Sequence, residues 1–316
     1  MLKKLYTAMQ EKFLRSKKKK VNSGISVEAR QAFVRHYIPT NASILEIGAS
    51  YCPVFPKQYG EKYGFSVCTL DRMPTKELIS YFTSKNEAKA LIDRIEEVDF
   101  VWNGQKYSDI VGKKLFDIVI ACDVIEHQPD IITFLLNCNS IMKANAKLFL
   151  AVPDKRRHTD FYRPCASLAS IIDAFDQKRL QPTLGSVLEN ILVKAKLEGP
   201  EIRRSWYYLT PGKIKLIDAL ASKQHFERAL HAIAGGGYVD AHVWTFTPHY
   251  FRYLLEELYH LGLQPFREEK FADGFGSEFF LLLSREGTGP GLSREQLLQT
   301  YMAEHNDPRK KHLQYV

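Results

Sequence analysis

The chain has 316 residues, of which 45% are hydrophobic and 25% charged, a composition typical of a globular protein with a sizeable core. Its five cysteines are odd in number and show no Cys-x-x-Cys spacing, so the sequence predicts no disulfide framework, no metal site and a reducing, cytoplasmic location. No apolar run approaches the length of about 18 residues that a membrane-spanning helix needs, and the first residues lack an apolar signal segment.

Positive charge is concentrated at the start of the chain. Residues 1–20 hold eight Lys and Arg against one Glu, a net +7, so the remaining 296 residues account for only +1 of the total +8. This near-neutral body argues against a broad nucleic-acid-binding face. Apolar residues recur at helical spacing near the start, and residues 1–25 are therefore predicted to form a basic amphipathic segment. Both a peripheral contact with an anionic membrane and a solvated tail are consistent with that pattern.

Strands and helices are predicted to alternate over the first half of the chain. Residues 26–38 have the pattern of a helix capped by Ser26. Apolar runs predict strands at 43–47, 65–70, 98–102, 116–121 and 147–152. Helical periodicity is found at 75–97 and 131–142. Strands that alternate with helices imply parallel pairing, and we expect an α/β fold with a doubly wound sheet.

The pattern changes after Pro153. Residues 154–243 contain no predicted strand but three helix-like stretches, at 168–175, 184–195 and 214–233. Because such an insertion is too long for a loop, we interpret it as a helical cap, or substrate insertion, over the cofactor face of the sheet.

The sheet is predicted to resume after this insertion. A helix is expected at 248–261, and strands near 263–271 and at 278–284 flank a glycine-containing turn, so one of the two must be antiparallel. The core would thus comprise residues 26–153 and 244–290, followed by a C-terminal helix and tail over 291–316.

Two predicted strand ends carry the residues of a nucleoside pocket. The run that contains Glu46 ends at Gly48, where a glycine turn lets a ligand approach the backbone. The next strand ends at Asp71, and an acid at this position can accept both hydrogen bonds of a ribose diol. The further glycines of a pyrophosphate-binding loop are absent after Gly48. A ligand with ribose and base but no pyrophosphate, such as S-adenosylmethionine, fits this pattern better.

These residues make the chain similar to the class I S-adenosylmethionine-dependent methyltransferases. The run from Phe116 to Asp130, with Glu126-His127 after the strand, resembles the fourth-strand motif of many small-molecule methyltransferases. The run from Val152 to Arg156 (Val-Pro-Asp-Lys-Arg), then 160–164, 240–248 and 278–280, resembles a narrower subgroup found beside or fused to sugar-transferring enzymes. The turn after Gly48 and the residues 143–146 depart from the class pattern.

The resemblance implies a mostly parallel, seven-stranded Rossmann-like sheet with an antiparallel last strand, and S-adenosylmethionine as cofactor. It implies roles along the methionine and ribose for Glu46, Gly48 and Ala49, on the ribose hydroxyls for Asp71, on the adenine for Asp99 and Phe100, and at the pocket floor for Cys122 and Asp123.

Candidate catalytic residues are His127 and His242, because histidine suits proton transfer near neutral pH, together with Asp160. Candidate substrate-binding residues are Lys155, Arg156 and Arg163, which follow the fifth strand, and Tyr207, which stands with Trp206 and Tyr208 in a possible sugar-stacking platform. Each has a structural alternative: a packed histidine, a surface charge, or the aromatic core of the cap.

The leading hypothesis is an S-adenosylmethionine-dependent O-methyltransferase that acts on a saccharide or other small polar acceptor, with a histidine general base. A catalytically silent methyltransferase-like module that recruits partners through its basic segment is an alternative. A nicotinamide-dependent oxidoreductase is disfavoured by the missing phosphate-binding glycines, and RNA methylation by the near-neutral body.

Overall fold

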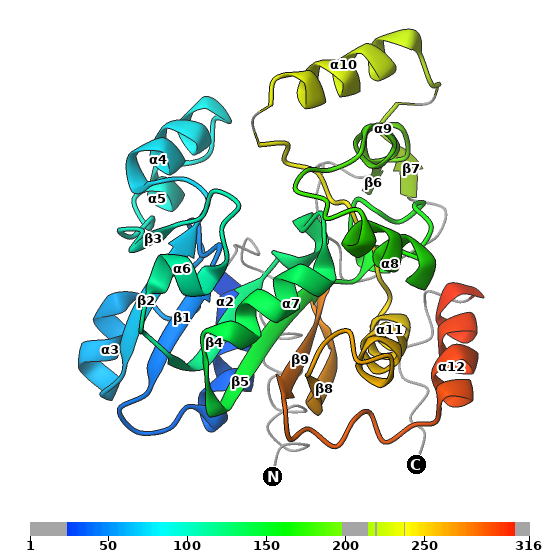
Figure 1. Ribbon diagram of the computed structural model, residues 1–316. Helices are drawn as coiled ribbons and strands as arrows, with labels where there is room; N and C mark the ends of the chain where they lie inside the picture. Colours follow the sequence, from blue (N-terminus) through cyan, green and yellow to red (C-terminus); the bar gives the residue numbers. More distant parts are fainter. Residues whose placement is uncertain (1–23, 198–213, 219, 237, 307–316) are drawn as a thin grey trace, which may run out of the picture.

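The computed structural model describes residues 24–197, 214–218, 220–236 and 238–306 (Figure 1). The basic segment at residues 1–20 and the aromatic group around Tyr207 lie outside these ranges. In the described part of the chain, no helix is both long enough and apolar enough to cross a bilayer.

One seven-stranded sheet forms the centre of the molecule, with the strand order β3-β2-β1-β4-β5-β9-β8. The strands are β1 Ser43–Ile47, β2 Ser66–Asp71, β3 Phe100–Val101, β4 Phe116–Cys122, β5 Met142–Pro153, β8 Arg267–Phe275 and β9 Glu278–Ser284. All neighbours from β3 to β5 pair in parallel, whereas β9 is antiparallel to both β5 and β8. The predicted doubly wound sheet with an antiparallel last strand is therefore confirmed.

Helices cover both faces of this sheet, so its central strands are buried on both sides. On β5, Leu148 and Leu150 face one hydrophobic cluster while Phe149 and Ala151 face the other, and all four are fully buried. The first cluster includes residues of α6 Tyr107–Val111, α7 Ile131–Ser140 and α11 Pro248–His260, and the second includes residues of α2 Gly24–Val34 and α3 Lys57–Tyr63. Burial on both faces explains why β4, β5 and β9 have continuous apolar runs.

The remaining helices lie around this core. Helices α4 Thr75–Ser84 and α5 Lys89–Ile92 lie beyond the β3 edge, and α12 Arg294–Asn306 lies beside α11 (Figure 1). The predicted single helix over residues 75–97 is wrong because the chain adopts the left-handed conformation at Asn86 (φ 57°), which ends a helix. The predicted strand at 98–102 shortens to two residues, and the one predicted at 263–271 begins later, at Arg267.

Between β5 and α11 the chain forms α8 Leu168–Asp176, α9 Leu184–Leu192, β6 Ala195–Leu197, β7 Ile214–Leu216 and α10 Lys223–Ala234. Figure 1 shows these elements beyond the edge of the sheet at which β4 and β5 end. The strands β6 and β7 pair antiparallel, so the prediction of an all-helical segment with a helix over 214–233 is wrong in part. A three-residue strand is too short for sequence periodicity to distinguish it from a helical turn.

Candidate active site

The sheet has a topological switch point between β1 and β4. These strands are neighbours, but the chain leaves β1 toward β2 and β3 and returns to β4 before it continues toward β5. In open α/β sheets, ligands bind outside the carboxyl ends of the strands at such a point. The ends of β1, β2 and β4 therefore define the candidate active site.

The turn after β1 closes against the loop after β4. Gly48 has φ 65°, and its N–H donates to the carbonyl of Leu70 at 2.8 Å. A Cβ at this position would lie 2.8 Å from Cγ2 of Val124, so only glycine fits without displacement of its neighbour. The glycine that the sequence singled out thus holds the tips of β1, β2 and β4 together.

Glu46 shapes this turn from below. Its carboxylate accepts hydrogen bonds from the N–H groups of Val54 (2.6 Å) and Phe55 (3.3 Å). Burial raises the pKa of Glu46 to about 7, although these two bonds and the nearby Arg30 guanidinium favour the ionised form. Glu46 supports the loop over residues 49–55 rather than facing a ligand, and the prediction that it lies along the methionine and ribose is corrected.

A small pocket lies between the tips of β1 and β2, and Ala49, Ser50 and Asp71 line it. Oδ1 of Asp71 accepts from the N–H groups of Arg72 (2.7 Å) and Met73 (3.4 Å), which fixes the carboxylate. Burial raises the pKa of Asp71 despite these bonds. The buried hydroxyl of Ser50 has no hydrogen-bond partner among the described residues. A fixed carboxylate beside an unsatisfied hydroxyl suits a polar group such as a ribose, so these residues fit a nucleoside cofactor.

Asp99 and Phe100 were predicted to contact the adenine, but neither lines the small pocket between the tips of β1 and β2. Phe100 pairs with Leu70, so Asp99 lies level with Thr69, short of the strand end. Its carboxylate accepts from the N–H of Thr69 at 2.7 Å and pairs with Nζ of Lys57 at 2.8 Å. The adenine-binding role of Asp99 stays a prediction, and its carboxylate contacts Thr69 and Lys57.

The residues that reach the end of β3 are Val101 and Trp102, which the sequence analysis missed. Val101 pairs with Asp71, and the N–H of Trp102 donates to the carbonyl of Asp71 at 2.8 Å. The resemblance pointed to Asp99 and Phe100 instead. A strand of two residues, such as β3, has no periodicity from which its end could be placed.

An ion-pair network with Arg30 of α2 lies beneath the site. The guanidinium makes two hydrogen bonds to Glu278 of β9, at 2.7 and 3.0 Å, and a third to Asp123 after β4. Burial raises the pKa of Cys122, which precedes Asp123, well above its usual range. Cys122 and Asp123 do lie at the end of β4, as predicted. Arg30 was missed in the sequence analysis because its partners are distant along the chain.

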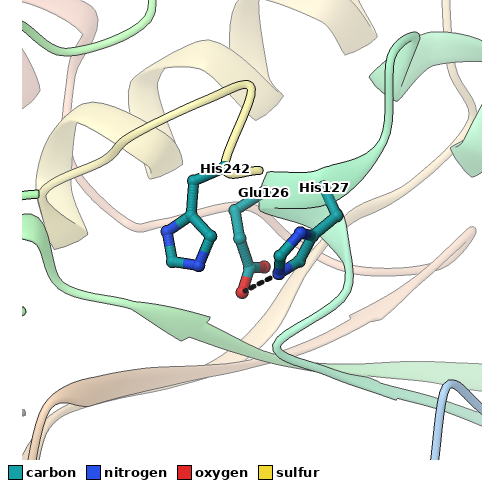
Figure 2. Close-up of side chains that lie close together, drawn as sticks. All are labelled: Glu126, His127 and His242. Carbon is teal, nitrogen blue, oxygen red and sulfur yellow. Dashed lines mark ion pairs between the residues drawn. The ribbon is translucent and has the colours of Figure 1, made fainter. Parts of the chain in front are cut away.

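Three ionisable side chains meet where the loop after β4 contacts the segment before α11 (Figure 2). Glu126 and His127 lie on a single turn of 3-10 helix, and His242 comes from that segment. The carbonyl of Glu126 accepts from the N–H groups of Val243 (2.7 Å) and Trp244 (3.1 Å), which docks the two segments. The two imidazole rings meet edge to face, with centroids 4.7 Å apart. The structure thus brings together both predicted bases; we call Glu126, His127 and His242 the histidine cluster.

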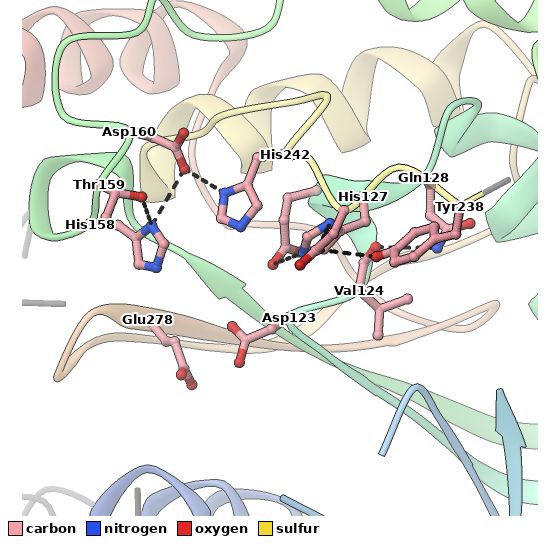
Figure 3. A network of polar contacts seen from close by, with 12 residues as sticks. Asp123, Val124, His127, Gln128, His158, Thr159, Asp160, Tyr238, His242 and Glu278 are labelled. Atoms are coloured by element: carbon pink, nitrogen blue, oxygen red, sulfur yellow. Dashed lines mark hydrogen bonds and ion pairs between the residues drawn. The ribbon is translucent and has the colours of Figure 1, made fainter. Parts of the chain in front are cut away.

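Asp160 contacts the ring of His242 (Figure 3), and Arg163 contacts both residues. Oδ2 of Asp160 lies 2.5 Å from Nδ1 of His242, and Oδ1 accepts from Arg163 at 3.1 Å. Arg163 also donates to the carbonyl of His242 at 2.8 Å. Burial works against charge on both partners, but their mutual attraction dominates: it raises the pKa of His242 and keeps that of Asp160 well below its usual range. Arg163 is buried and orients this pair, so its predicted role in substrate binding is corrected.

Lys155 and Arg156 are buried as well. Nζ of Lys155 donates to the carbonyl of Phe161 at 2.9 Å, and burial lowers its pKa. Arg156 makes a two-pronged contact with Asp154, with distances of 2.6 to 3.0 Å. These two side chains stabilise the turn after β5, and the prediction that they bind substrate is corrected.

Glu126 differs from the other buried acids because neither carboxylate oxygen has a hydrogen-bond partner among the described residues. It is only 1% exposed, and burial raises its pKa to about 8. Burial also lowers the pKa of His127 to about 4, and the charge of His242 acts in the same direction. The cluster therefore contains an acid and an imidazole that are costly to ionise without an additional partner.

The segment before α11 also contacts the β2 side of the site. The ring of Tyr238 lies under the guanidinium of Arg72, 3.5 Å from ring centroid to Cζ. Asp240 accepts from the hydroxyls of Tyr81 (3.1 Å) and Tyr238 (3.2 Å). The end of the insertion thus bridges the nucleoside pocket and the histidine cluster, an arrangement that the sequence analysis did not anticipate.

A larger hollow of about 390 Å³ lies at the opposite edge of the sheet, near the start of β4. It is lined by Tyr37, Asp117 and residues 143–147 and contains none of the predicted site residues. Because it lies at the amino ends of the parallel strands, away from the switch point, we do not assign the active site to it.

The chain belongs to a family described as a methyltransferase domain, whose sequence pattern matches residues 26–258, more than two thirds of the chain. No curated protein matches the chain.

Several solved structures are similar to the chain at low sequence identity. One is a S-adenosylmethionine-dependent methyltransferase from Clostridium acetobutylicum ATCC 824, with 10% identity over 91% of this chain and 100% of that chain and a TM-score of 0.41. Another is the CcbJ methyltransferase from Streptomyces caelestis, with 8% identity over 84% and 92% of the two chains and a TM-score of 0.42. The mitomycin 7-O-methyltransferase MmcR has 12% identity over 83% of this chain and a TM-score of 0.39, and the match spans only 53% of its length. The chain also spans about half the length (54%) of the glycopeptide N-methyltransferase MtfA.

Proposed function

We propose that this protein is an S-adenosylmethionine-dependent methyltransferase that acts on a hydroxyl of a saccharide or another small polar acceptor. The observation that carries the proposal is the juxtaposition of two sites at one switch point. The pocket with Asp71 and Ser50 lies at the tips of β1 and β2, and the histidine cluster lies beside the end of β4. The family match supports methyl transfer, and the saccharide acceptor rests on the sequence resemblance described above.

In this proposal, Asp71 accepts hydrogen bonds from the ribose hydroxyls of the cofactor. When bound, S-adenosylmethionine supplies a methyl group on a sulfonium centre that is already activated for displacement. The protein mainly has to align donor and acceptor, and such positioning can lower the barrier by about 7–11 kcal/mol in favourable cases. Asp71 is suited to this task because two backbone N–H groups fix its carboxylate.

His242 is the group that we propose as the general base. Its Nδ1 is bonded to Asp160, which leaves Nε2 free of that bond and able to take a proton from an acceptor hydroxyl. Asp160 would orient the ring and stabilise the imidazolium that forms, as the carboxylate does in hydrolytic triads. His127 packs edge to face against His242 and would line the acceptor side.

Calorimetry with S-adenosylmethionine and S-adenosylhomocysteine tests this function. We expect both to bind, and Asp71→Asn to weaken binding at least about tenfold, because the neutral amide loses charge-assisted hydrogen bonds to the ribose. Asp99→Asn is the matched control: it changes an acid on the adjacent strand whose carboxylate faces Thr69 and Lys57, and binding should stay within about threefold. Absence of binding by either ligand at millimolar concentration would overturn the enzymatic proposal.

A further inference from the structure

We propose that Glu126, His127 and His242 bind a divalent transition-metal ion of the zinc type, with Asp160 and Asp240 as supporting carboxylates. The ion would lie beside the nucleoside pocket, where it could take an oxygen of the methyl acceptor.

The geometry of the cluster suits such an ion. Glu126, His127 and His242 each offer one ligand atom, and these atoms all lie within 4.8 Å of one another. Nε2 of His127 is 3.8 Å from Oε1 of Glu126, with His242 on the other side of the carboxylate (Figure 2). Bonds of about 2.0–2.2 Å at tetrahedral angles place two donor atoms on zinc roughly 3.3–3.6 Å apart. The side chains of the cluster would therefore have to draw together by about 1 Å to close the site. Two imidazoles and one carboxylate are a donor set that holds zinc or iron and leaves a position open.

Unsatisfied polar atoms within the cluster point to a missing ligand. Both carboxylate oxygens of Glu126 and Nδ1 of His127 are buried and have no hydrogen-bond partner among the described residues. Native proteins rarely leave such atoms unsatisfied, because each costs about 1–3 kcal/mol, and more when the group is charged. A cation bound between Glu126 and the two rings would supply the carboxylate with its partner.

Further carboxylates lie where a metal site needs them. Histidine ligands usually donate their second ring N–H to a carboxylate, which fixes the tautomer and strengthens the metal bond. Nδ1 of His242 is bonded to Asp160, and Nδ1 of His127 lies 3.6 Å from Oδ1 of Asp240. Asp160 is in turn fixed by Arg163.

A second group of possible ligands, His158, Asp160 and His242, overlaps this site. There Oδ2 of Asp160 is shared by Nδ1 of His158 at 3.5 Å and Nδ1 of His242. Because Asp160 already has these partners and Arg163, the observations favour the group with Glu126.

The role of the ion rests on the proposed function, whereas its binding does not. An ion with an open position would bind the acceptor oxygen and lower the pKa of the hydroxyl, so that the hydroxyl gives up its proton to solvent. With the ion bound, Nε2 of His242 would hold the metal and the ion would activate the hydroxyl in its place, so the general-base role proposed above belongs to the metal-free site. Calorimetry with metal alone therefore tests the site separately from methyl transfer.

The experiment is a titration of the full-length chain with Zn²⁺ after removal of metals with a chelator. We expect one ion per chain, and Glu126→Gln and His242→Ala should each weaken binding at least about tenfold. Asp160→Asn should weaken it about 10- to 100-fold, as is usual for residues that support a ligand. His260→Ala removes an exposed histidine with a carboxylate neighbour outside the cluster and should leave binding unchanged.

Folding and cofactor binding are measured on the same variants. Zn²⁺ should raise the unfolding temperature of the unaltered protein but not that of Glu126→Gln, since a ligand stabilises only the state that binds it. The proposal is overturned if no Zn²⁺ binds, or if Glu126→Gln and His242→Ala bind it as the unaltered protein does. Retained S-adenosylmethionine binding without Zn²⁺ binding would reject the metal site alone, and the reverse result would reject the cofactor proposal alone.

Discussion

The two halves of the candidate active site treat buried acids differently. At the tips of β1 and β2, Glu46 and Asp71 each accept two backbone N–H bonds, and their carboxylates are held by the loops that they shape. At the end of β4, Glu126 is equally buried, but no hydrogen bond satisfies its carboxylate among the described residues. The comparison teaches that burial alone does not identify a reactive acid: the side chain that lacks its expected partners is the stronger indication of a ligand.

The largest effect is expected from His242→Ala. This variant tests whether the histidine cluster at the end of β4 takes part in the reaction. Removal of this group should lower turnover by about 10²- to 10⁴-fold, as is usual for loss of a positioned acid–base group. Binding of S-adenosylmethionine should stay within about twofold, since the cofactor pocket lies at β1 and β2. Steady-state kinetics with an accepted substrate and calorimetry measure the two effects separately.

A matched control for this variant is His249→Ala. His249 also pairs with a buried carboxylate, Glu304 at 2.7 Å, but on α11 and α12 and outside the cluster. The His249→Ala variant should be less stable than the unaltered protein but should keep its turnover rate. Equal losses of turnover in both variants would show that His242→Ala acts by destabilising the fold. The histidine cluster would then have no special part in the reaction.

The next largest effect is a loss of stability on substitution of Arg30, which joins α2 to Glu278 of β9 and to Asp123 after β4. Arg30→Met would remove the guanidinium partner of the buried Glu278 and of Asp123, and should lower the free energy of unfolding by about 3–5 kcal/mol. Chemical denaturation measures this loss. The double variant Arg30→Met with Glu278→Leu should recover part of it, because the buried carboxylate is then gone as well.

An exposed ion pair provides the comparison for Arg30. Arg294 pairs with Glu257 at 2.7 Å, and its side chain is 70% exposed. Arg294→Met should leave the free energy of unfolding nearly unchanged, because an exposed ion pair contributes little. A loss as large as that of Arg30→Met would contradict the assignment of Arg30 as the buried support.

The smallest effect is expected from Glu46→Gln, as a change in the pH dependence of the free energy of unfolding. Its pKa of about 7 in the folded protein lies above the ordinary value of 4.5, with Arg30 and Glu96 as charged neighbours. The folded state therefore binds this proton more tightly, and stability falls as the pH rises from about 4.5 to 7. Glu46→Gln should remove this component, so its stability relative to the unaltered protein should improve from pH 5 to pH 8. Urea unfolding at several pH values measures it.

The exposed Glu97 serves as the control for this prediction. Glu97→Gln should leave the pH profile of stability unchanged. The contrary outcome is a stability of Glu46→Gln that changes with pH in parallel with that of the unaltered protein. That result would show that the pKa of Glu46 is not raised in the folded state.

The sequence predicted much of the scaffold and part of the site. The bounds of β1 and β9 were correct because strands buried on both faces leave continuous apolar runs. Glycine at position 48 and the carboxylate at 71 were found from strand ends, and His127 and His242 were named although 115 positions separate them (242 − 127). The roles given to Lys155, Arg156 and Arg163 were wrong, because basic residues after a strand look alike in sequence whether they face solvent or a buried carboxylate.

By itself, the sequence determined the alternation of strands and helices and the residue types at the strand ends, since hydrophobic periodicity is a local property of the chain. Only the tertiary structure decided which of these side chains already have partners. Glu46 is satisfied by backbone N–H groups and Arg30 by carboxylates that lie 93 and 248 positions away. The carboxylate of Glu126 is left with two imidazoles nearby and no hydrogen bond among the described residues. Hydrogen bonding and burial depend on the neighbours that folding brings together, and no local pattern encodes them.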